Sequence, residues 1–182
     1  MIYSLTIAPA IDYSLNRGDK EIKIDATNRP TSDGYSVGGK GITVSRRLKN
    51  LRVKNTPIVA VGGGMGKRLK NIIDKEFDKI IYLSVIGETR LDVRITGPHT
   101  DTRFNPSAPK VTEKGRQKRY AYLKKNLKKG DIVILSGSVG QERKDLYADL
   151  RKDIIERSGA LTIVDTTGES LTSLFPYQPF RI

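Results

Sequence analysis

A glycine-rich segment with one lysine, residues 36–46 (SVGGKGITVSR), is the first place where residue types suggest chemistry. Gly38, Gly39 and Gly41 allow a ligand to approach the backbone closely. They come directly before an expected helix, whose free N–H groups and dipole favour an anion or polar oxygens. Lys40 adds a positive point charge. The segment therefore predicts a ligand site, against the plainer alternative of a turn that only begins a helix.

The same residues come close to a nucleotide-binding P-loop, and two differences argue against that interpretation. From Gly34 the sequence reads GYSVGGKG, one residue short of the pattern G-x-x-x-x-G-K-[ST]. Gly41 stands where a P-loop has the hydroxyl that binds Mg²⁺. Residues 28–33 are polar, whereas a P-loop follows a buried strand. We therefore expect Lys40 to bind something other than the nucleotide.

Three other polar residues follow strand-like segments: Asp12, Ser138 and Asp165. Open α/β sheets bind ligands at the carboxyl ends of their strands, so these residues are expected to share one rim of a sheet. The single histidine, His99, has no partner residues at metal-ligand spacing, and we interpret it as a loop residue and expect no metal site. No G-x-S-x-G hydrolase motif occurs.

The elements that must position these residues alternate between helical and strand-like patterns. Apolar runs lie at residues 57–61, 80–83, 132–135 and 161–164, with helical periodicity between them. This order is typical of a parallel sheet covered by helices on both faces. Residues 19–36 and 90–95 instead alternate polar and apolar, which predicts strands with one wet face. We expect them in a small separate sheet, a lid over the site.

The composition describes a basic domain of 182 residues. The 33 Lys and Arg residues exceed the 20 Asp and Glu residues and give a net charge of +13. This suggests an anionic partner such as a phosphorylated metabolite or nucleic acid, or only a well-solvated surface. The densest cluster, residues 116–119, falls on a helix expected from Thr112, where a solvated face is the favoured interpretation. The chain lacks cysteine, a membrane-spanning run and a signal-peptide pattern, so we expect a cytoplasmic protein.

Taken together and in order, these motifs resemble the PfkB sugar kinases of the ribokinase-like superfamily. The similarity is greatest to the branch that phosphorylates sugar phosphates, namely phosphofructokinases, fructose-1-phosphate kinases and tagatose-6-phosphate kinases. Residues 38–46 (GGKGITVSR) resemble the family signature G-G-[KG]-G-x-N-V-[SA]-R. The other matching segments are residues 6–12 (TIAPAID), 89–90 (TR), 103–106 (RFNP), 135–138 (LSGS) and 164–169 (VDTTGE).

The resemblance implies an α/β, ribokinase-like fold: a mostly parallel sheet flanked by helices, with a small β lid from about residues 14–36 and 88–106. It implies an ATP-dependent carbohydrate kinase, a phosphotransferase that converts a ketohexose phosphate to a bisphosphate, of the 6-phosphofructokinase or 1-phosphofructokinase type. ATP and Mg²⁺ are the implied cofactors. Lid strands often pair between subunits in this family, so a homodimer through the lid is a further expectation.

The resemblance also assigns roles to residues. Asp12 would accept hydrogen bonds from sugar hydroxyls, and Ser138 would contact sugar or phosphate. The substrate-binding set is Asp12, Gly38, Gly39, Lys40, Thr43, Arg90, Arg103 and Ser138, in which Lys40, Arg90 and Arg103 hold the phosphate that the substrate already carries. Asp165 is expected on the cofactor side.

The departures from the family pattern lead to further expectations. Thr43 stands where the signature has Asn, and Val139 follows Ser138 where the family has a Leu-Pro-Pro-Gly run. The family's second half, with a Gly-Ala-Gly-Asp motif that supplies the catalytic base and with most of the ATP site, has no counterpart in residues 1–182. We therefore expect an N-terminal part that is inactive alone. The alternative hypothesis is a degenerate, non-catalytic binding module, for nucleic acid in particular.

Overall fold

The computed structural model describes residues 1–182, which form two β-sheets and their covering helices. The larger sheet is entirely parallel, and it pairs strands that are far apart in the sequence. Its strands in spatial order are β5 (Ile81–Ser84), β4 (Asn55–Val61), β1 (Ile2–Thr6), β8 (Ile132–Ser136) and β9 (Leu161–Asp165). The predicted α/β fold with a mostly parallel sheet is thus confirmed.

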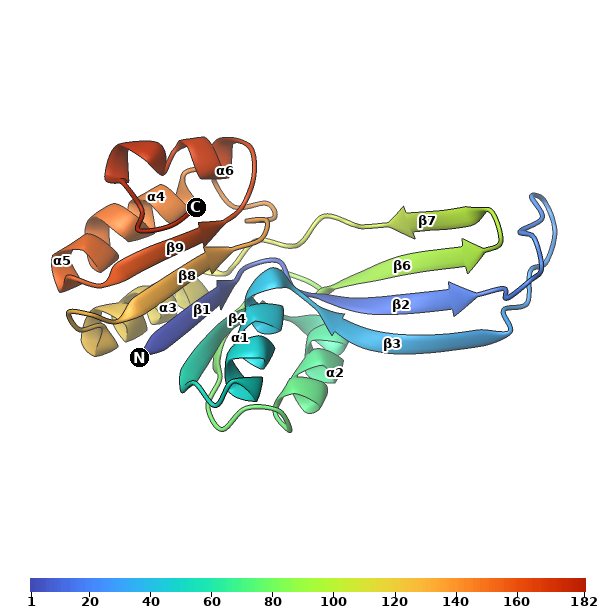
Figure 1. Cartoon of the computed structure of the whole chain (residues 1–182), viewed down its shortest axis with the longest axis horizontal. Coiled ribbons are helices and arrows are strands. Elements are labelled where there is room, and N and C mark those ends of the chain that lie inside the picture. Colours follow the sequence, from blue (N-terminus) through green and yellow to red (C-terminus); the bar gives the residue numbers. More distant parts are fainter.

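Helices cover both faces of this sheet (Figure 1). On one face lie α1 (Lys40–Asn50) and α2 (Gly63–Ile73). On the other lie α3 (Glu113–Asn126) and a continuous helical stretch made of α4 (Leu146–Leu150), a π-helical turn (Arg151–Ile155) and α5 (Glu156–Ser158). A short helix α6 (Glu169–Thr172) and a 3₁₀ turn (Phe175–Tyr177) follow β9.

The core is divided between the two faces because neighbouring residues of a strand point to opposite sides. In β4, the buried Ile58 belongs to the core beneath α3 and α4, whereas the buried Val59 belongs to the core beneath α1 and α2. Both faces of the strand are therefore dry, as the continuous apolar run PIVAV predicts. This buried layer supports the loops at its edges.

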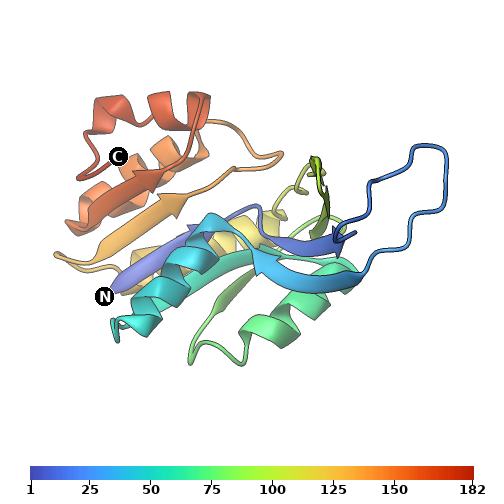
Figure 2. The same cartoon turned by 45° about the vertical axis from the view of Figure 1, so that its right-hand side comes forward.

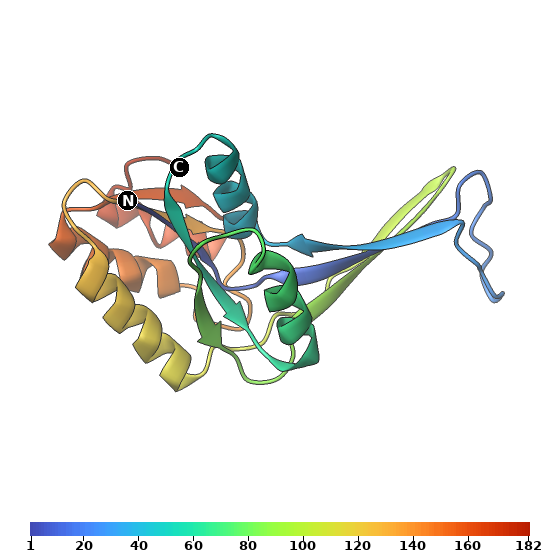
Figure 3. The same ribbon diagram turned by 90° about the horizontal axis from the view of Figure 1, so that it is seen from below.

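The smaller sheet, which we call the lid after its expected role, projects away from the helix-covered layer, as the view from below in Figure 3 shows. Its strands in spatial order are β3 (Ser32–Gly38), β2 (Ala10–Asn16), β6 (Arg90–Gly97) and β7 (Thr100–Phe104). Pairing of β2 with β3 and of β6 with β7 is antiparallel, and β2 with β6 is parallel. The strands fall near the ranges expected for a lid, but β2 begins earlier, at Ala10.

One strand prediction in this region is wrong. Residues 19–31, expected to continue as a strand, form a long loop between β2 and β3 at the outer end of the lid (Figure 2). The loop is held by local polar contacts, including hydrogen bonds from the Asn28 amide to the carbonyls of Lys23 and Ala26. The alternation of apolar and polar residues at positions 22–24 does not produce a buried sheet face, and Ile24 is 83% exposed.

None of the helices is long and apolar enough to span a bilayer.

Candidate functional site

The lid strands sort their side chains onto two faces. Because Asp12 is opposite Ser36 on β3 and opposite Asp92 on β6, these three residues lie on the same face of the lid. Arg90 and Arg94 follow on that face of β6, and Arg103, opposite Arg94, continues it on β7. Asp101 lies on this face too, beside Arg103 on β7, so the polar face carries three carboxylates and three guanidinium groups within one small sheet.

Asp12 sits against the backbone of the neighbouring strand, which explains the glycine at position 38. A Cβ atom at Gly38 would lie 2.8 Å from Asp12 Oδ1 and closer still to Oδ2, so any larger residue would displace the carboxylate. Burial raises the pKa of Asp12, and the positive charges of Arg90, Arg103 and Arg46 oppose that rise. The sequence predicts that Asp12 comes directly after the first strand. In the structure it is instead the third residue of lid strand β2.

A small cavity of about 230 Å³ opens on this polar face. Its lining comes from all four lid strands and the residue after β7: Asp12, Ser14, Ser36, Asp92, Val93, Arg94, Arg103 and Asn105. Arg90 contacts one of these lining residues, with its Nη2 3.5 Å from Asp92 Oδ2. Its hydrogen bonds to the carbonyls of Pro106 and Ala8 are long, at 3.4 and 3.3 Å, and its buried Nε has no partner. Arg90 therefore has hydrogen-bonding capacity left for an anionic ligand.

The N-terminus of α1 faces the same region and is uncapped. Its N-cap residue Gly39 has φ +126°, a conformation that favours glycine, and no side chain accepts from the first helical N–H groups. No acidic residue lies in the first turn. Thr43 is exposed in that turn, where its hydroxyl is free to contact a ligand. Gly38, Gly39 and Thr43 are thus grouped around an open helix end, whose free N–H groups favour an anion.

The second glycine-rich turn, before α2, gives a useful contrast. There the Glu88 carboxylate accepts hydrogen bonds from Gly64 N (2.9 Å) and Met65 N (3.0 Å), and these bonds lower the pKa of Glu88. Gly63 has φ +65°, and a Cβ there would overlap Glu88. This helix end is already occupied, so the glycines of residues 62–66 serve the packing of this turn against Glu88.

Lys40 connects the start of α1 to the far side of the large sheet. Its Nζ lies 2.7 Å from Asp165 Oδ1 at the carboxyl end of β9, and both side chains are about half exposed. The aliphatic part of Lys40 lies beside Gly137, which follows β8. The structure thus brings Lys40 and Asp165 together at the carboxyl end of the large sheet, where Asp165 ends β9.

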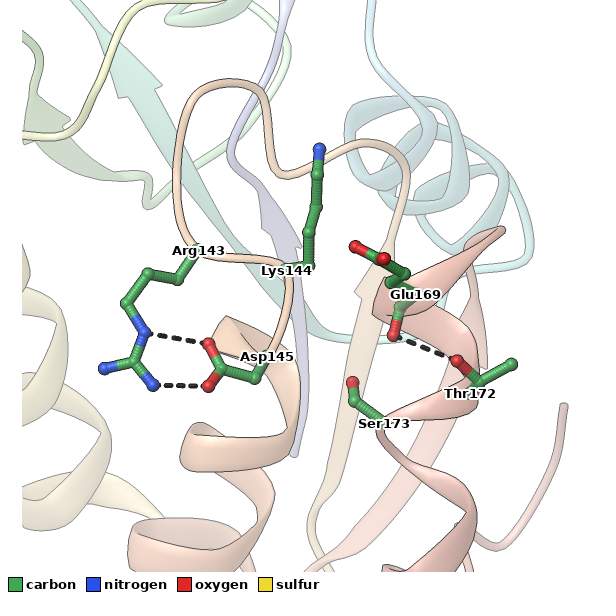
Figure 4. A pocket seen from close by; sticks show the side chains of 6 residues that line it. All are labelled: Arg143, Lys144, Asp145, Glu169, Thr172 and Ser173. Atoms are coloured by element: carbon green, nitrogen blue, oxygen red, sulfur yellow. Dashed lines mark hydrogen bonds and ion pairs between the residues drawn. The ribbon is translucent and has the colours of Figure 1, made fainter.

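Ser138 is placed differently from the other predicted site residues. Its Oγ accepts a hydrogen bond from Gly140 N at 3.0 Å, and it lines a separate cavity of about 210 Å³ with the segment that follows β9. A larger hollow of about 570 Å³ adjoins it and shares Lys144 and Glu169. In Figure 4, Lys144 lies between the Arg143–Asp145 ion pair and Glu169. Asp12 and Ser138 therefore line different cavities, and the expectation of one shared rim is wrong for Asp12, which lies on lid strand β2 and not on the large sheet.

Sequence reasoning missed Asp92 as a site residue. Its side chain is only 13% exposed, its Oδ1 has no hydrogen-bond partner, and burial raises its pKa. The signal was available: the alternation in residues 90–95 places Asp92 on the same face as Arg90. What the sequence alone lacked was the pairing of Asp92 with Asp12 across β2 and β6.

Other candidate chemistries gain nothing from the structure. No group of three or more His, Cys, Asp or Glu residues is arranged to hold a metal ion, and His99 lies exposed in the turn between β6 and β7. In the basic cluster on α3, Arg119 is only 4% exposed, and Arg116 pairs with Glu113 at 2.9 Å. The cluster is therefore a poorer nucleic-acid surface than its sequence suggests.

Comparisons with known proteins agree with this geometry. The chain is 30% identical, over all of its length, to a 1-phosphofructokinase of Borreliella burgdorferi. It is 28% identical over 94% of its length to a tagatose-6-phosphate kinase of Staphylococcus epidermidis. A solved structure from Staphylococcus aureus, provisionally named a phosphofructokinase, superposes with a TM-score of 0.83 at 34% identity, over 98% of this chain and 57% of that one.

The chain spans 58% and 54% of the length of these two curated relatives. The model of the pfkB family of carbohydrate kinases matches residues 1–178, which is nearly the whole chain. The ordered motifs of the sequence and the parallel sheet with its lid point the same way. The chain belongs to the pfkB carbohydrate kinase family.

Proposed function

We propose that this chain carries the sugar-phosphate site of a kinase that transfers the γ-phosphoryl group of ATP to a phosphorylated ketohexose. The observation that carries the proposal is the polar face of the lid, where carboxylates and guanidinium groups surround one cavity next to an uncapped helix N-terminus. A sugar phosphate has hydroxyls that carboxylates can accept from and a dianion that arginines can bind.

The roles divide by chemical type. Asp12 accepts hydrogen bonds from sugar hydroxyls, while Gly38 and Gly39 offer backbone N–H groups and Thr43 a hydroxyl. Arg90 and Arg103 hold the substrate's existing phosphate; a guanidinium can bind it through two parallel hydrogen bonds. Lys40, beside Asp165 at 2.7 Å, supplies a third positive charge. Ser138 belongs to the adjoining cavity and would contact the substrate only if the two cavities join on lid closure.

For ATP and Mg²⁺, the residues of this chain do not complete a site. Asp165 is the expected cofactor-side carboxylate, yet it stands alone at the rim and is paired with Lys40. Mg²⁺ is usually bound by one or two carboxylates together with substrate phosphates, so a lone paired carboxylate is a weak ligand set. We therefore derive no step through either group. Residues 1–182 by themselves are expected to show little or no turnover.

Calorimetry with fructose 6-phosphate, fructose 1-phosphate and tagatose 6-phosphate tests the proposal. At least one of these should bind the chain, and Arg90→Ala should weaken that binding by about tenfold or more, because a charge-assisted hydrogen bond is lost. Arg157→Ala, an exposed arginine on α5 away from the lid, is the matched control and should bind as the wild type does. Failure of all three sugars to bind, or equal binding by Arg90→Ala, would contradict the proposal.

We also propose that the protein is cytoplasmic and forms a homodimer through the outer face of the lid. That face carries Tyr13 stacked on Tyr35 at 4.4 Å, and Phe104 is 57% exposed. An exposed aromatic sheet face is a typical protein–protein contact surface. Analytical ultracentrifugation of the wild type and of Phe104→Ser tests this. The wild type should sediment as a dimer and the variant as a monomer.

A further inference from the structure

A partly buried carboxylate on lid strand β6, Asp92, has hydrogen-bonding capacity that the fold does not use. Its side chain is 13% exposed, yet its Oδ1 is a buried atom without any hydrogen-bond partner. Its other oxygen, Oδ2, has a single charged neighbour, Arg90 Nη2, at 3.5 Å, which is too long for a strong hydrogen bond. An unpaired buried carboxylate oxygen is costly, so its retention requires a reason.

The position of Asp92 supplies that reason. Asp92 lines the same cavity of about 230 Å³ as Asp12, and the two residues are directly opposite each other in the parallel pairing of β2 and β6. Neighbouring strands are about 4.8 Å apart, so the two carboxylates stand side by side on the polar face of the lid. Burial raises the pKa of Asp92, and the negative charge of Asp12 adds to the rise, while Arg90 opposes it.

Two adjacent carboxylates suit a ligand with neighbouring hydrogen-bond donors. Each carboxylate accepts only, so the donors must come from the ligand or from water. The guanidinium groups of Arg94 and Arg103 line the same cavity, but Arg94 is already paired with Asp101 at 2.7 Å. The hydroxyl groups of a polyol are donors of the right type, and they carry no charge that the arginines would repel.

From this arrangement we infer that Asp92 is a specificity-determining residue that accepts a hydrogen bond from a second hydroxyl of the sugar, next to the one bound by Asp12. The inference rests on the proposed function, since it names how the same site distinguishes a phosphorylated polyhydroxy sugar from other phosphate compounds. Asp92 adds nothing to the binding of a bare phosphate, because its negative charge repels the phosphate anion.

The test compares two ligands on the same variants. Asp92→Ala should weaken binding of the phosphosugar by about tenfold or more, because a hydrogen bond to a charged acceptor is lost. The same variant should bind inorganic phosphate as well as the wild type or better, because a negative charge near the arginines has been removed. Asp92→Asn keeps the shape of the side chain and one neutral acceptor. Its phosphosugar affinity should therefore lie between those of the wild type and Asp92→Ala.

The control is Asp33→Ala. Asp33 lies on the outer face of the lid, where it accepts from the Tyr13 hydroxyl at 2.9 Å, so neither ligand should be affected. Melting temperatures of all variants check that each is folded.

Each outcome has a distinct meaning. If Asp92 only holds Arg90 in place, Asp92→Ala will weaken phosphosugar and inorganic phosphate alike, and the inference is overturned. If Asp92→Ala binds the phosphosugar as the wild type does, the inference is also overturned, while the proposed function stands. If the wild-type chain binds no phosphosugar at all, it is the proposed function that fails.

Discussion

The two sheets of this protein are built on opposite principles, and the candidate site lies where they meet. The large sheet is parallel, buried on both faces and filled by aliphatic side chains. The lid has a polar face with two partly buried carboxylates, Asp12 and Asp92, and an outer face with exposed aromatics such as Phe104. The comparison teaches that stability and ligand recognition are assigned to different sheets, so substitutions in them should have separable effects.

The largest expected effect comes from the core of the large sheet. Leu83 on β5 is fully buried, and Leu83→Ala should lower the free energy of unfolding by about 2–5 kcal/mol through lost burial and a residual cavity. Val93→Ala on the half-buried lid should cost clearly less, about 1 kcal/mol. Urea denaturation of both variants measures the difference. Equal losses would contradict the division of roles between the sheets.

A second prediction uses two glycines of the same lid strand. Gly38→Ala should cost about 1–3 kcal/mol and displace Asp12, because its Cβ would overlap that carboxylate. Gly34→Ala meets nothing within 4 Å and should leave stability within about 0.5 kcal/mol of the wild type. Phosphosugar affinity should fall only in Gly38→Ala. If both variants lose affinity equally, the close approach of Asp12 to Gly38 is not what shapes the site.

A third prediction concerns pH. Because burial raises the folded-state pKa of Asp92 above its ordinary value of 3.8, the folded protein holds this proton more tightly than the unfolded chain does. The wild type therefore loses stability as the pH rises through the interval between the ordinary and the raised pKa. Asp92→Asn removes that loss, so its stability relative to wild type should increase across the same interval. Denaturation curves from pH 4 to pH 8 measure this, and a pH-independent difference would contradict it.

Only a small effect on stability is expected from the ion pair between Lys40 and Asp165. Lys40 and Asp165 are each about half exposed, so Lys40→Met should change the free energy of unfolding by less than about 1 kcal/mol. Lys40→Met should nevertheless bind the phosphosugar more weakly than the wild type does, because it lacks a positive charge near the phosphate. Thermal melts and calorimetry separate the two effects. A large stability loss with unchanged affinity would make Lys40 a structural residue.

The large sheet was predictable because its signals are local. Residues 57–61 form a continuous apolar run and fall inside β4, and Thr112 caps α3, where its hydroxyl accepts from Gly115 N. The buried side of a helix is less easily predicted: in α1 the apolar Leu51 is 73% exposed at the C-terminal end, while Ile42 and Ser45 are buried. Local periodicity identifies a helix better than it identifies which side is covered.

The lid was harder to predict because its geometry depends on pairing between distant strands. Alternation in residues 90–95 correctly indicates a strand with a wet face, but the same pattern in residues 19–31 belongs to a loop. The neighbour of Asp12 is Asp92, eighty positions along the chain, and only the strand register brings them together. The case of Ser138 is the reverse. The sequence correctly places it just after a strand, but the structure puts it in a different cavity from Asp12.

The central claim is that the polar face of the lid and the start of α1 form one sugar-phosphate site. Titration of the isotopically labelled chain with fructose 6-phosphate, followed by amide NMR shifts, tests it residue by residue. The account predicts shifts at Gly38, Gly39, Lys40 and residues 90–94, with none along α3. Shifts confined to α3 or to the hollow around Lys144, or no shifts at a saturating concentration of the sugar, would contradict it.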